Sequence, residues 1–299
     1  MNFSILKLTK SLWVVLIAAF LFGSCKTSNL TSNSIKVPSS IFKYFKYEGK
    51  SSPMVSVHRG GGEMAGYPEN CLESFQNISS KMPCIIECDV EVTKDSVLVL
   101  MHDKTLDRTS TGSGLVVSHN FSEIKEYYLE DNFGYRTNFR IPTLENTLDW
   151  GKNKVIFTLD VKKTTPYRKV LELVKSKKAE NFAVIITYNA NEAIEVYKLN
   201  PDVLISVSLM QESDYYRLKE LGIPNKNMLA FIGTREPKAE FIEFLHQKGI
   251  KTILGVLGNL DKKAAAKGDE FYDELIKKGV DILATDRPEA VFSRIQKSN

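Results

Sequence analysis

From Met54 onward, short apolar runs alternate with longer stretches in which apolar residues recur at helical spacing. The short runs, rich in Val, Ile and Leu, are typical of buried strands, and the longer stretches are typical of amphipathic helices. Strands are predicted at residues 54–57, 85–92, 97–101, 155–161, 183–187, 203–208, 228–232, 252–257 and 280–284. Helical patterns lie between most of them, for example at 167–178, 190–199 and 238–248. This alternation predicts an α/β domain with a parallel sheet.

Only four residues, 93–96, separate the second and third predicted strands. A crossover between parallel strands needs about a dozen residues or more, so these two strands must form an antiparallel hairpin. Without the hairpin arm at 97–101, eight strands remain for the parallel sheet. They predict a single (β/α)8 TIM barrel with a β-hairpin excursion after the second strand.

The beginning of the chain has a different pattern. Lys7 and Lys10 precede an apolar stretch at 12–22, which is too short to span a bilayer as a helix. The pattern predicts a secretory signal peptide at residues 1–24. The small residues before Cys25 resemble a bacterial lipobox, in which that cysteine carries the lipid. Plain cleavage and an uncleaved anchor are the alternatives.

Residues 25–50 are mostly polar and rich in Ser, Thr, Asn and Lys, which predicts a tether. The barrel domain is expected to occupy residues 51–299. Together these segments predict an exported protein of the periplasm or outer cell envelope, in contact with the membrane through a lipid anchor.

Composition narrows the range of partners. The 299 residues are 43% hydrophobic and 25% charged, with a formal net charge of +4 that loss of residues 1–24 would lower to +2. Lys and Arg do not form a dense patch, so no nucleic-acid partner is expected. The remaining cysteines, Cys71, Cys84 and Cys88, fit neither a disulfide framework nor a zinc site. They are predicted to be core residues, with one 71–84 or 71–88 bridge as the alternative.

Ionisable residues recur where the predicted strands end. They are His58 and Arg59 after the first strand, Glu87 and Asp89 in the second, His102 after the hairpin arm, and Asp160 and Lys162 at the end of the next parallel strand. Charged residues are costly in a core but natural at the carboxyl ends of barrel strands, where barrel enzymes have their active sites. The sequence therefore predicts a catalytic site at that end of the barrel.

The position of the hairpin turn determines which residue of the second strand lies opposite His102. A turn at 94–95 would place His102 opposite Glu87, and a turn at 95–96 would place it opposite Asp89. In either register the imidazole would reach the strand face that carries both carboxylates, because these alternate along the strand.

The two carboxylates Glu87 and Asp89 repel each other, and a hard divalent cation with oxygen ligands would relieve that repulsion. Asp160, on the next parallel strand, could complete the ligand set. The sequence therefore predicts a site for one divalent cation.

An ordered set of motifs resembles the glycerophosphodiester phosphodiesterase family. The motifs are His58-Arg59-Gly60, Pro68-Glu69-Asn70, Glu87-x-Asp89, His102-Asp103, Ile141-Pro142-Thr143-Leu144-Glu145, Asp160-Val161-Lys162, Gly279-Val280-Asp281 and Thr285-Asp286-Arg287-Pro288. They follow the family order from about residue 54 to 290. Two departures stand out. Asp160 occupies a position where the family usually has Glu, and residues 256–259 lack the tryptophan of the family motif.

The resemblance implies hydrolysis of a small-molecule glycerophosphodiester to an alcohol and glycerol 3-phosphate. It implies that His58 and His102 act as general acid and base, that Glu87, Asp89 and Asp160 bind one Ca2+ or Mg2+, and that Arg59 and Lys162 contact the phosphate. Two alternatives remain open at this stage. One is a phospholipase-type lyase that releases a cyclic phosphate, and the other is a non-catalytic phosphodiester-binding lipoprotein. The headgroup and the oligomeric state are not predicted.

Other polar residues receive structural interpretations. Glu69 and Asn70 are predicted to brace the loop after the first strand, Asp103 and Asp286 to serve as turn and cap residues, and His119 and His246 to lie on the surface.

Overall fold

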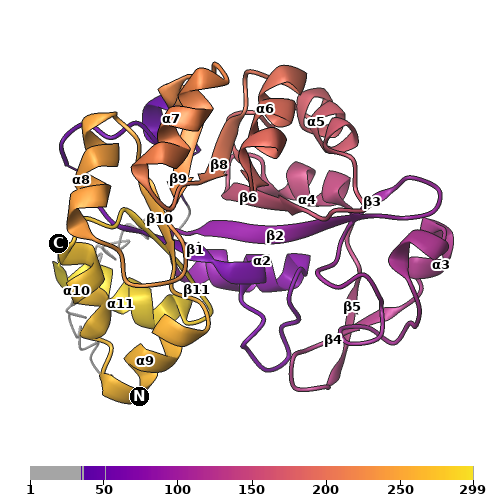
Figure 1. Ribbon diagram of the computed structural model, residues 1–299. Helices are drawn as coiled ribbons and strands as arrows, with labels where there is room; N and C mark the ends of the chain where they lie inside the picture. Colours follow the sequence, from indigo (N-terminus) through magenta and orange to yellow (C-terminus); the bar gives the residue numbers. More distant parts are fainter. Residues whose placement is uncertain (1–34, 36, 51, 299) are drawn as a thin grey trace, which may run out of the picture. The chain divides into compact units, whose positions relative to one another are not determined.

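The computed structural model describes residues 35, 37–50 and 52–298. Eight parallel strands form a closed barrel, in which each strand pairs with its neighbour and β1 pairs with both β11 and β2 (Figure 1). The strands are β1 (Met54–Val57), β2 (Ile85–Val92), β6 (Ile156–Val161), β7 (Ala183–Thr187), β8 (Leu204–Ser208), β9 (Met228–Phe231), β10 (Thr252–Gly255) and β11 (Ile282–Thr285). The predicted TIM barrel is confirmed.

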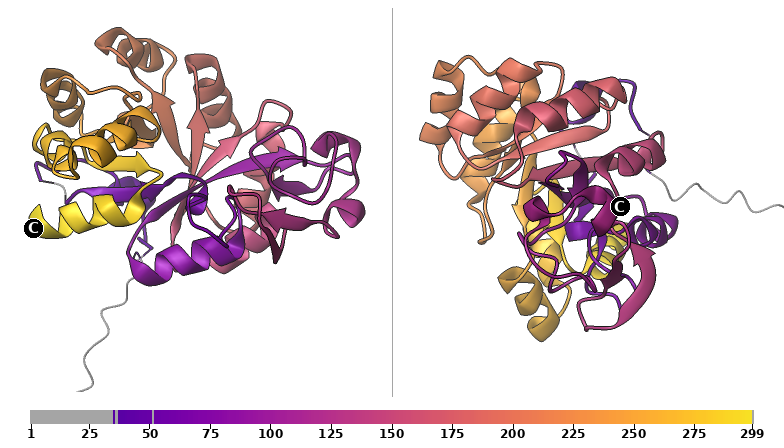
Figure 2. Two further views of the ribbon diagram at one scale, coloured as in Figure 1. Left: turned by 90° about the horizontal axis from the view of Figure 1, so that it is seen from below. Right: turned by 90° about the vertical axis from the view of Figure 1, so that its right-hand side faces the viewer.

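Helices surround the outside of the strands (Figure 2). They are α2 (Leu72–Lys81), α4 (Leu144–Gly151), α5 (Tyr167–Ser176), α6 (Ala190–Leu199), α7 (Glu212–Glu220), α8 (Ala239–Gln247), α9 (Asn259–Lys267), α10 (Phe271–Lys277) and α11 (Pro288–Ser298). Because helices cover one face of the sheet and the barrel interior the other, strands such as β6 are buried at every position. This double burial explains their continuous apolar runs.

The hairpin arm β3 (Leu98–Leu100) pairs antiparallel with β2, as expected, but neither predicted register is correct. Val90 lies opposite Leu100 and Val92 opposite Leu98, which centres the turn on Asp95. Ser96 adopts a left-handed φ of 68° and accommodates the odd-numbered loop. Continued along the ladder, this register would place position 102 opposite position 88, between the two predicted partners. His102 lies beyond the end of β3, and its preceding residue still donates a backbone hydrogen bond to the Asp89 carbonyl oxygen at 3.1 Å.

An insertion between β3 and α4 packs beside the barrel with a small core of its own (Figure 1). It contains α3 (Phe121–Ile124) and a two-stranded antiparallel sheet of β4 (Tyr128–Glu130) and β5 (Arg136–Arg140). The Tyr128 ring stacks against the guanidinium groups of Arg136 and Arg140, at 3.8 and 3.5 Å from their central carbons. Neither of these two strands is among those predicted from the sequence.

The segment before β1 packs on the amino ends of the barrel strands. Helix α1 (Ile41–Tyr44) buries Ile41, and Lys46 forms a β-bridge with Ile250. The Tyr47 ring stacks on His246, with ring centres 3.6 Å apart. The prediction that His246 lies on the surface is therefore wrong. His246 is half-buried, and its Nε2 atom also lies 2.8 Å from Asp281 Oδ2.

Cys71, Cys84 and Cys88 are all free and buried, so the core interpretation is confirmed and the alternative bridges are absent. Among the described residues, no helix is both long and apolar enough to cross a bilayer. Cys25 and the predicted signal peptide lie outside the described residues.

Candidate active site

A cavity of about 230 Å³ opens at the carboxyl ends of the barrel strands. His58, Glu87, Asp89, His102 and Asp160 all line it. The remaining lining comes in two kinds. One is made of hydroxyl-bearing residues, Ser56, Thr158, Thr187, Tyr188, Ser206, Ser208 and Thr234, and the other of apolar residues, Ile186, Phe231, Ile253, Leu257 and Ala284.

Three carboxylates form a cluster in this cavity. Asp89 on β2 and Asp160 on β6 are register partners of adjacent parallel strands, and Glu87 lies two residues earlier on β2. One oxygen of each lies within 4.8 Å of the others. Burial and the charge of Asp89 raise the pKa of Glu87 to about 8. Burial likewise raises the pKa of Asp160, whose buried Oδ1 atom has no hydrogen-bond partner among the described residues. An orphaned oxygen among three crowded carboxylates fits a hard divalent cation.

Lys162 is the cation closest to this cluster. Its Nζ atom lies 2.5 Å from Asp89 and 2.7 Å from Asp160. Burial alone would raise the pKa of Asp89, but the charge of Lys162, the charge of His102 and the hydrogen bonds from Lys162 and Asn70 together outweigh burial and lower it. Lys162 therefore helps to keep one of the three acids ionised in a site where crowding favours protonation.

Arg59 follows β1 in a left-handed conformation, with φ 52° and ψ 22°. In this conformation its backbone N–H donates to Glu87 Oε2 at 2.8 Å, while its guanidinium reaches Glu69 at 3.0 Å. The next residue must be glycine, because Gly60 has φ 71° and a Cβ there would lie 2.1 Å from the Phe75 ring. The tight turn is therefore built into the sequence and directs Arg59 toward the acid cluster.

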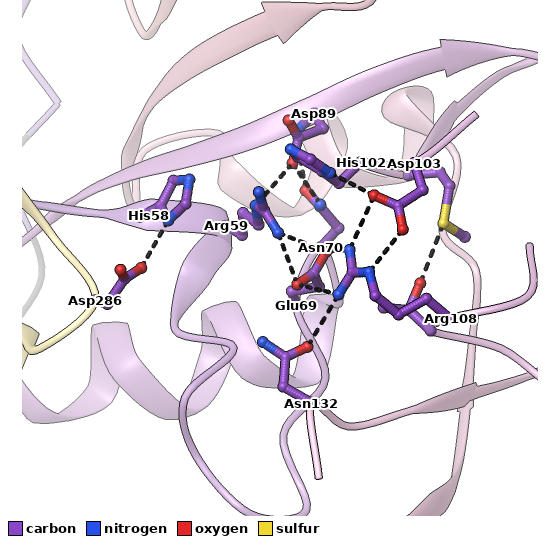
Figure 3. A network of polar contacts seen from close by, with 12 residues as sticks. His58, Arg59, Glu69, Asn70, Asp89, His102, Asp103, Arg108, Asn132 and Asp286 are labelled. Atoms are coloured by element: carbon purple, nitrogen blue, oxygen red, sulfur yellow. Dashed lines mark hydrogen bonds and ion pairs between the residues drawn. The ribbon is translucent and has the colours of Figure 1, made fainter. Parts of the chain in front are cut away.

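His58 pairs with Asp286, which follows β11, at 2.7 Å from Nδ1 to Oδ1 (Figure 3). A carboxylate can only accept, so Nδ1 carries a proton and Nε2 is the atom left for exchange. Burial would lower the pKa of His58, but the hydrogen bond to Asp286 and the charge of Glu87 outweigh it and raise the pKa.

His102 pairs with its own neighbour, Asp103, at 2.6 Å from Nδ1 to Oδ1. Arg108 donates to Asp103 from Nε at 2.6 Å and to Glu69 from Nη2 at 2.7 Å. Glu69 thus bridges Arg108 and Arg59, so one continuous network joins the second histidine to the turn after β1 (Figure 3). Hydrogen bonds from Arg108 lower the pKa of Asp103 to about 2, which keeps it an ionised partner for the imidazole.

The interpretation of Asp103 and Asp286 as turn and cap residues is therefore wrong, since each carboxylate orients a histidine. The sequence carried a signal for both, because each follows a strand at the same end of the barrel as the histidines. Its pattern could not show which way the carboxylates point. Glu69 and Asn70 do brace the loop, and Asn70 also donates to Asp89 at 2.7 Å.

Tyr188 was missed. It directly follows β7, lines the cavity, and is 59% exposed. Burial of its hydroxyl and the nearby charge of Asp160 raise the pKa of Tyr188. Its place after a strand end was the available signal. In segment 256–259, which lacks the tryptophan of the family motif, Leu257 lines the cavity, whereas Asn259 begins α9 and is exposed.

Residues 58–290 match the sequence model of the glycerophosphoryl diester phosphodiesterase family. The chain belongs to this family. A glycerophosphodiester phosphodiesterase of Caldanaerobacter subterraneus subsp. tengcongensis is 27% identical over 253 residues, covering 82% of this chain and 98% of that protein. A glycerophosphoryl diester phosphodiesterase from Parabacteroides distasonis has a crystal structure similar to this one, with a TM-score of 0.79, 33% identity, and coverage of 86% of this chain and 91% of that one.

A phosphodiesterase of Oleispira antarctica, solved in complex with the product sn-glycerol-3-phosphate, shares the fold with a TM-score of 0.66 at 19% identity. The matched region covers 86% of this chain and 99% of the Oleispira antarctica chain. The resemblance drawn from the ordered motifs is thus confirmed at the level of the family.

Proposed function

We propose that the chain hydrolyses glycerophosphodiesters, using water to release an alcohol and glycerol 3-phosphate. The observation that carries this proposal is a pair of histidines, His58 and His102, lining one cavity with an acid cluster, each hydrogen-bonded through Nδ1 to its own carboxylate. The names of the family relatives support the same activity. So does the product bound to the Oleispira antarctica enzyme.

Hydrolysis requires one proton transfer from the attacking water and one to the departing alcohol. The water oxygen forms a bond to phosphorus while the bond from phosphorus to the alcohol oxygen breaks. One imidazole takes a proton from the water, and the other gives a proton to the departing alcohol. His58 and His102 suit these roles because their carboxylate partners fix the tautomer and leave Nε2 of each ring for proton exchange.

The charged residues have complementary roles. Glu87, Asp89 and Asp160 would hold one Ca2+ or Mg2+, since their oxygens converge and both ions prefer oxygen ligands. Such an ion, when bound, stabilises negative charge on the phosphate oxygens. Arg59 and Lys162 would bind the phosphate, and the planar fork of Arg59 suits two oxygens at once.

Turnover of a panel of glycerophosphodiesters, measured with Ca2+ or Mg2+ and with and without a chelator, tests the proposal. Phosphorus NMR of the product separates the alternatives. Glycerol 3-phosphate supports hydrolysis, whereas a cyclic phosphate identifies the lyase. Binding of the diesters without turnover under any metal condition would identify a phosphodiester-binding lipoprotein instead.

We also propose that the chain is exported and held at the membrane by a lipid on Cys25, in the periplasm or outer cell envelope. The support is the pattern of residues 1–24, a basic start, a short apolar stretch and small residues before Cys25. A Cys25→Ser variant should move from the membrane to the soluble fraction. Unchanged membrane association of that variant would refute lipidation.

A further inference from the structure

Glu69 is a buried acid that lies between the two arginines of the active-site network (Figure 3). Only 2% of its surface is exposed. Arg59 donates to it from Nη1 at 3.0 Å, and Arg108 donates from Nη2 at 2.7 Å and from Nη1 at 3.1 Å. Glu69 is not among the residues that line the catalytic cavity, so it can act on a substrate there only through these neighbours.

The two arginines differ in how many of their donors are already used. Arg108 gives one edge of its guanidinium to Glu69 and the other to Asp103, with Nη2 shared between them. Arg59 gives only Nη1 to Glu69. Its Nε atom, 3.8 Å from Asp89 Oδ2, is buried without a hydrogen-bond partner in the described part of the chain. A buried donor without a partner is costly, so this edge of Arg59 suits a ligand oxygen.

On one side, Glu69 determines which edge of Arg59 is presented to the acid cluster. The Asn70 N–H donates to the Arg59 carbonyl oxygen at 2.9 Å, which ties the segment carrying Glu69 to the turn after β1. With Nη1 held by Glu69, the edge formed by Nε and Nη2 remains for two phosphate oxygens. Asp89 is the other acid with which the guanidinium pairs. Without Glu69, Arg59 would therefore turn toward Asp89 and bind phosphate less well.

On the other side, Glu69 acts on His102 through a chain of contacts. It holds Arg108, Arg108 holds Asp103, and Asp103 lies 2.6 Å from the imidazole Nδ1. Without the charge of Glu69, the two guanidinium groups would repel each other. Arg108 is 42% exposed and would move outward, taking Asp103 and the imidazole with it. A misplacement of about 1 Å can lower a catalytic rate about a hundredfold.

We propose that Glu69 is a positioning residue with two routes to the reaction. Through Arg59 it orients the guanidinium edge that binds the phosphate. Through Arg108 and Asp103 it orients His102 for proton transfer. This inference rests on the proposed function and adds a residue to its machinery. A carboxylate that only held the loop together would change the stability of the protein and leave kcat and KM of the folded fraction unchanged.

Glu69→Gln tests both routes, with kcat and KM for glycerophosphocholine measured per folded molecule. We expect kcat to fall and KM to rise, each at least about tenfold, because His102 and Arg59 are both displaced. Glu69→Asp keeps the charge but shortens the reach by one methylene. It should show both changes at least about threefold, and it carries the test if the glutamine variant does not fold. Asp281→Asn is the matched control, because Asp281 is equally buried but contacts His246 at the amino ends of the strands.

A second background separates the two routes. Arg108→Met should lower kcat and leave KM within about twofold. In that background Glu69→Gln should have no further effect on kcat but should still raise KM, because only the route through Arg59 remains. The inference is overturned if the Glu69 variants keep both constants within about twofold, if the control matches them, or if Arg108→Met leaves the effect of Glu69→Gln on kcat unchanged. Failure of the unchanged protein to hydrolyse any glycerophosphodiester would instead refute the proposed function, and this inference with it.

Discussion

Asp286→Asn is the most direct test of how the catalytic histidines are oriented. Asp286 receives two hydrogen bonds, from His58 Nδ1 at 2.7 Å and, more weakly, from the Gly258 N–H at 3.3 Å. A carboxylate has an acceptor oxygen for each donor. Asparagine has only one such oxygen, so its NH2 group would face one of the two donors. The variant keeps the size of the side chain but removes its charge and one acceptor.

The size of the effect follows from these contacts. A hydrogen bond to a charged group contributes about 1.5–3 kcal/mol, and a neutral one about 0.5–1.5 kcal/mol. The difference of about 1–2 kcal/mol corresponds to a fall in kcat of about 5- to 30-fold. KM should change by less than about twofold, because Asp286 orients the imidazole and is not proposed to contact substrate.

Steady-state kinetics on a glycerophosphodiester would measure this effect in two backgrounds. In a His58→Ala background, Asp286→Asn should have almost no further effect, because its role depends on that imidazole. Asp273→Asn is the control, since Asp273 is about as exposed as Asp286 but bonds Arg294 on the outer helices. The reasoning fails if the two asparagine variants lose equal activity, or if Asp286→Asn lowers kcat as much without His58 as with it.

Three further predictions concern the same end of the barrel. His58→Ala and His102→Ala should each lower kcat by at least about a hundredfold, and the double variant should lose less than the product of the two; near-normal kcat in either single variant would refute the assignment. Chelation should abolish turnover and added Ca2+ or Mg2+ should restore it, whereas full activity in a thoroughly chelated sample would exclude the metal site. Arg108 lowers the pKa of Asp103 to about 2, and Arg108 and Arg59 together outweigh burial and lower the pKa of Glu69 below 4.5. These pairs therefore stabilise the fold above about pH 4.5 and lose their effect as pH falls toward 2. Arg108→Met should therefore lower the free energy of unfolding in urea near neutral pH and differ less from the unchanged protein near pH 2, and a difference that grows toward low pH would contradict this.

The barrel could be predicted from the sequence because its strands are buried on both faces. Such strands are predominantly apolar, and the four-residue gap at 93–96 left no topology but a hairpin for β3. The register of that hairpin could not be predicted, because it depends on the left-handed conformation of Ser96. Ser has no strong preference for that conformation.

The site was predictable where position alone decides it. Glu87 and Asp89 share a strand face, and Asp160 follows from the neighbouring strand, so their convergence needed only the strand order. The partners of the histidines were not predictable in the same way. Asp103 could have pointed to solvent, and Asp286 reaches His58 across 228 positions of sequence. Those contacts depend on side-chain directions that no local pattern encodes.

The closed barrel has a consequence for self-association. Unpaired strand edges are templates for aggregation, and closure removes them from all eight parallel strands. The outer edge of β3 is covered where Val99 bridges Thr143 and Leu100 donates to Pro142. The β4–β5 sheet instead carries arginines on β5, and charge on an edge strand discourages intermolecular pairing. Loss of the 142–143 cover would expose the outer edge of β3 and make it available for intermolecular strand pairing.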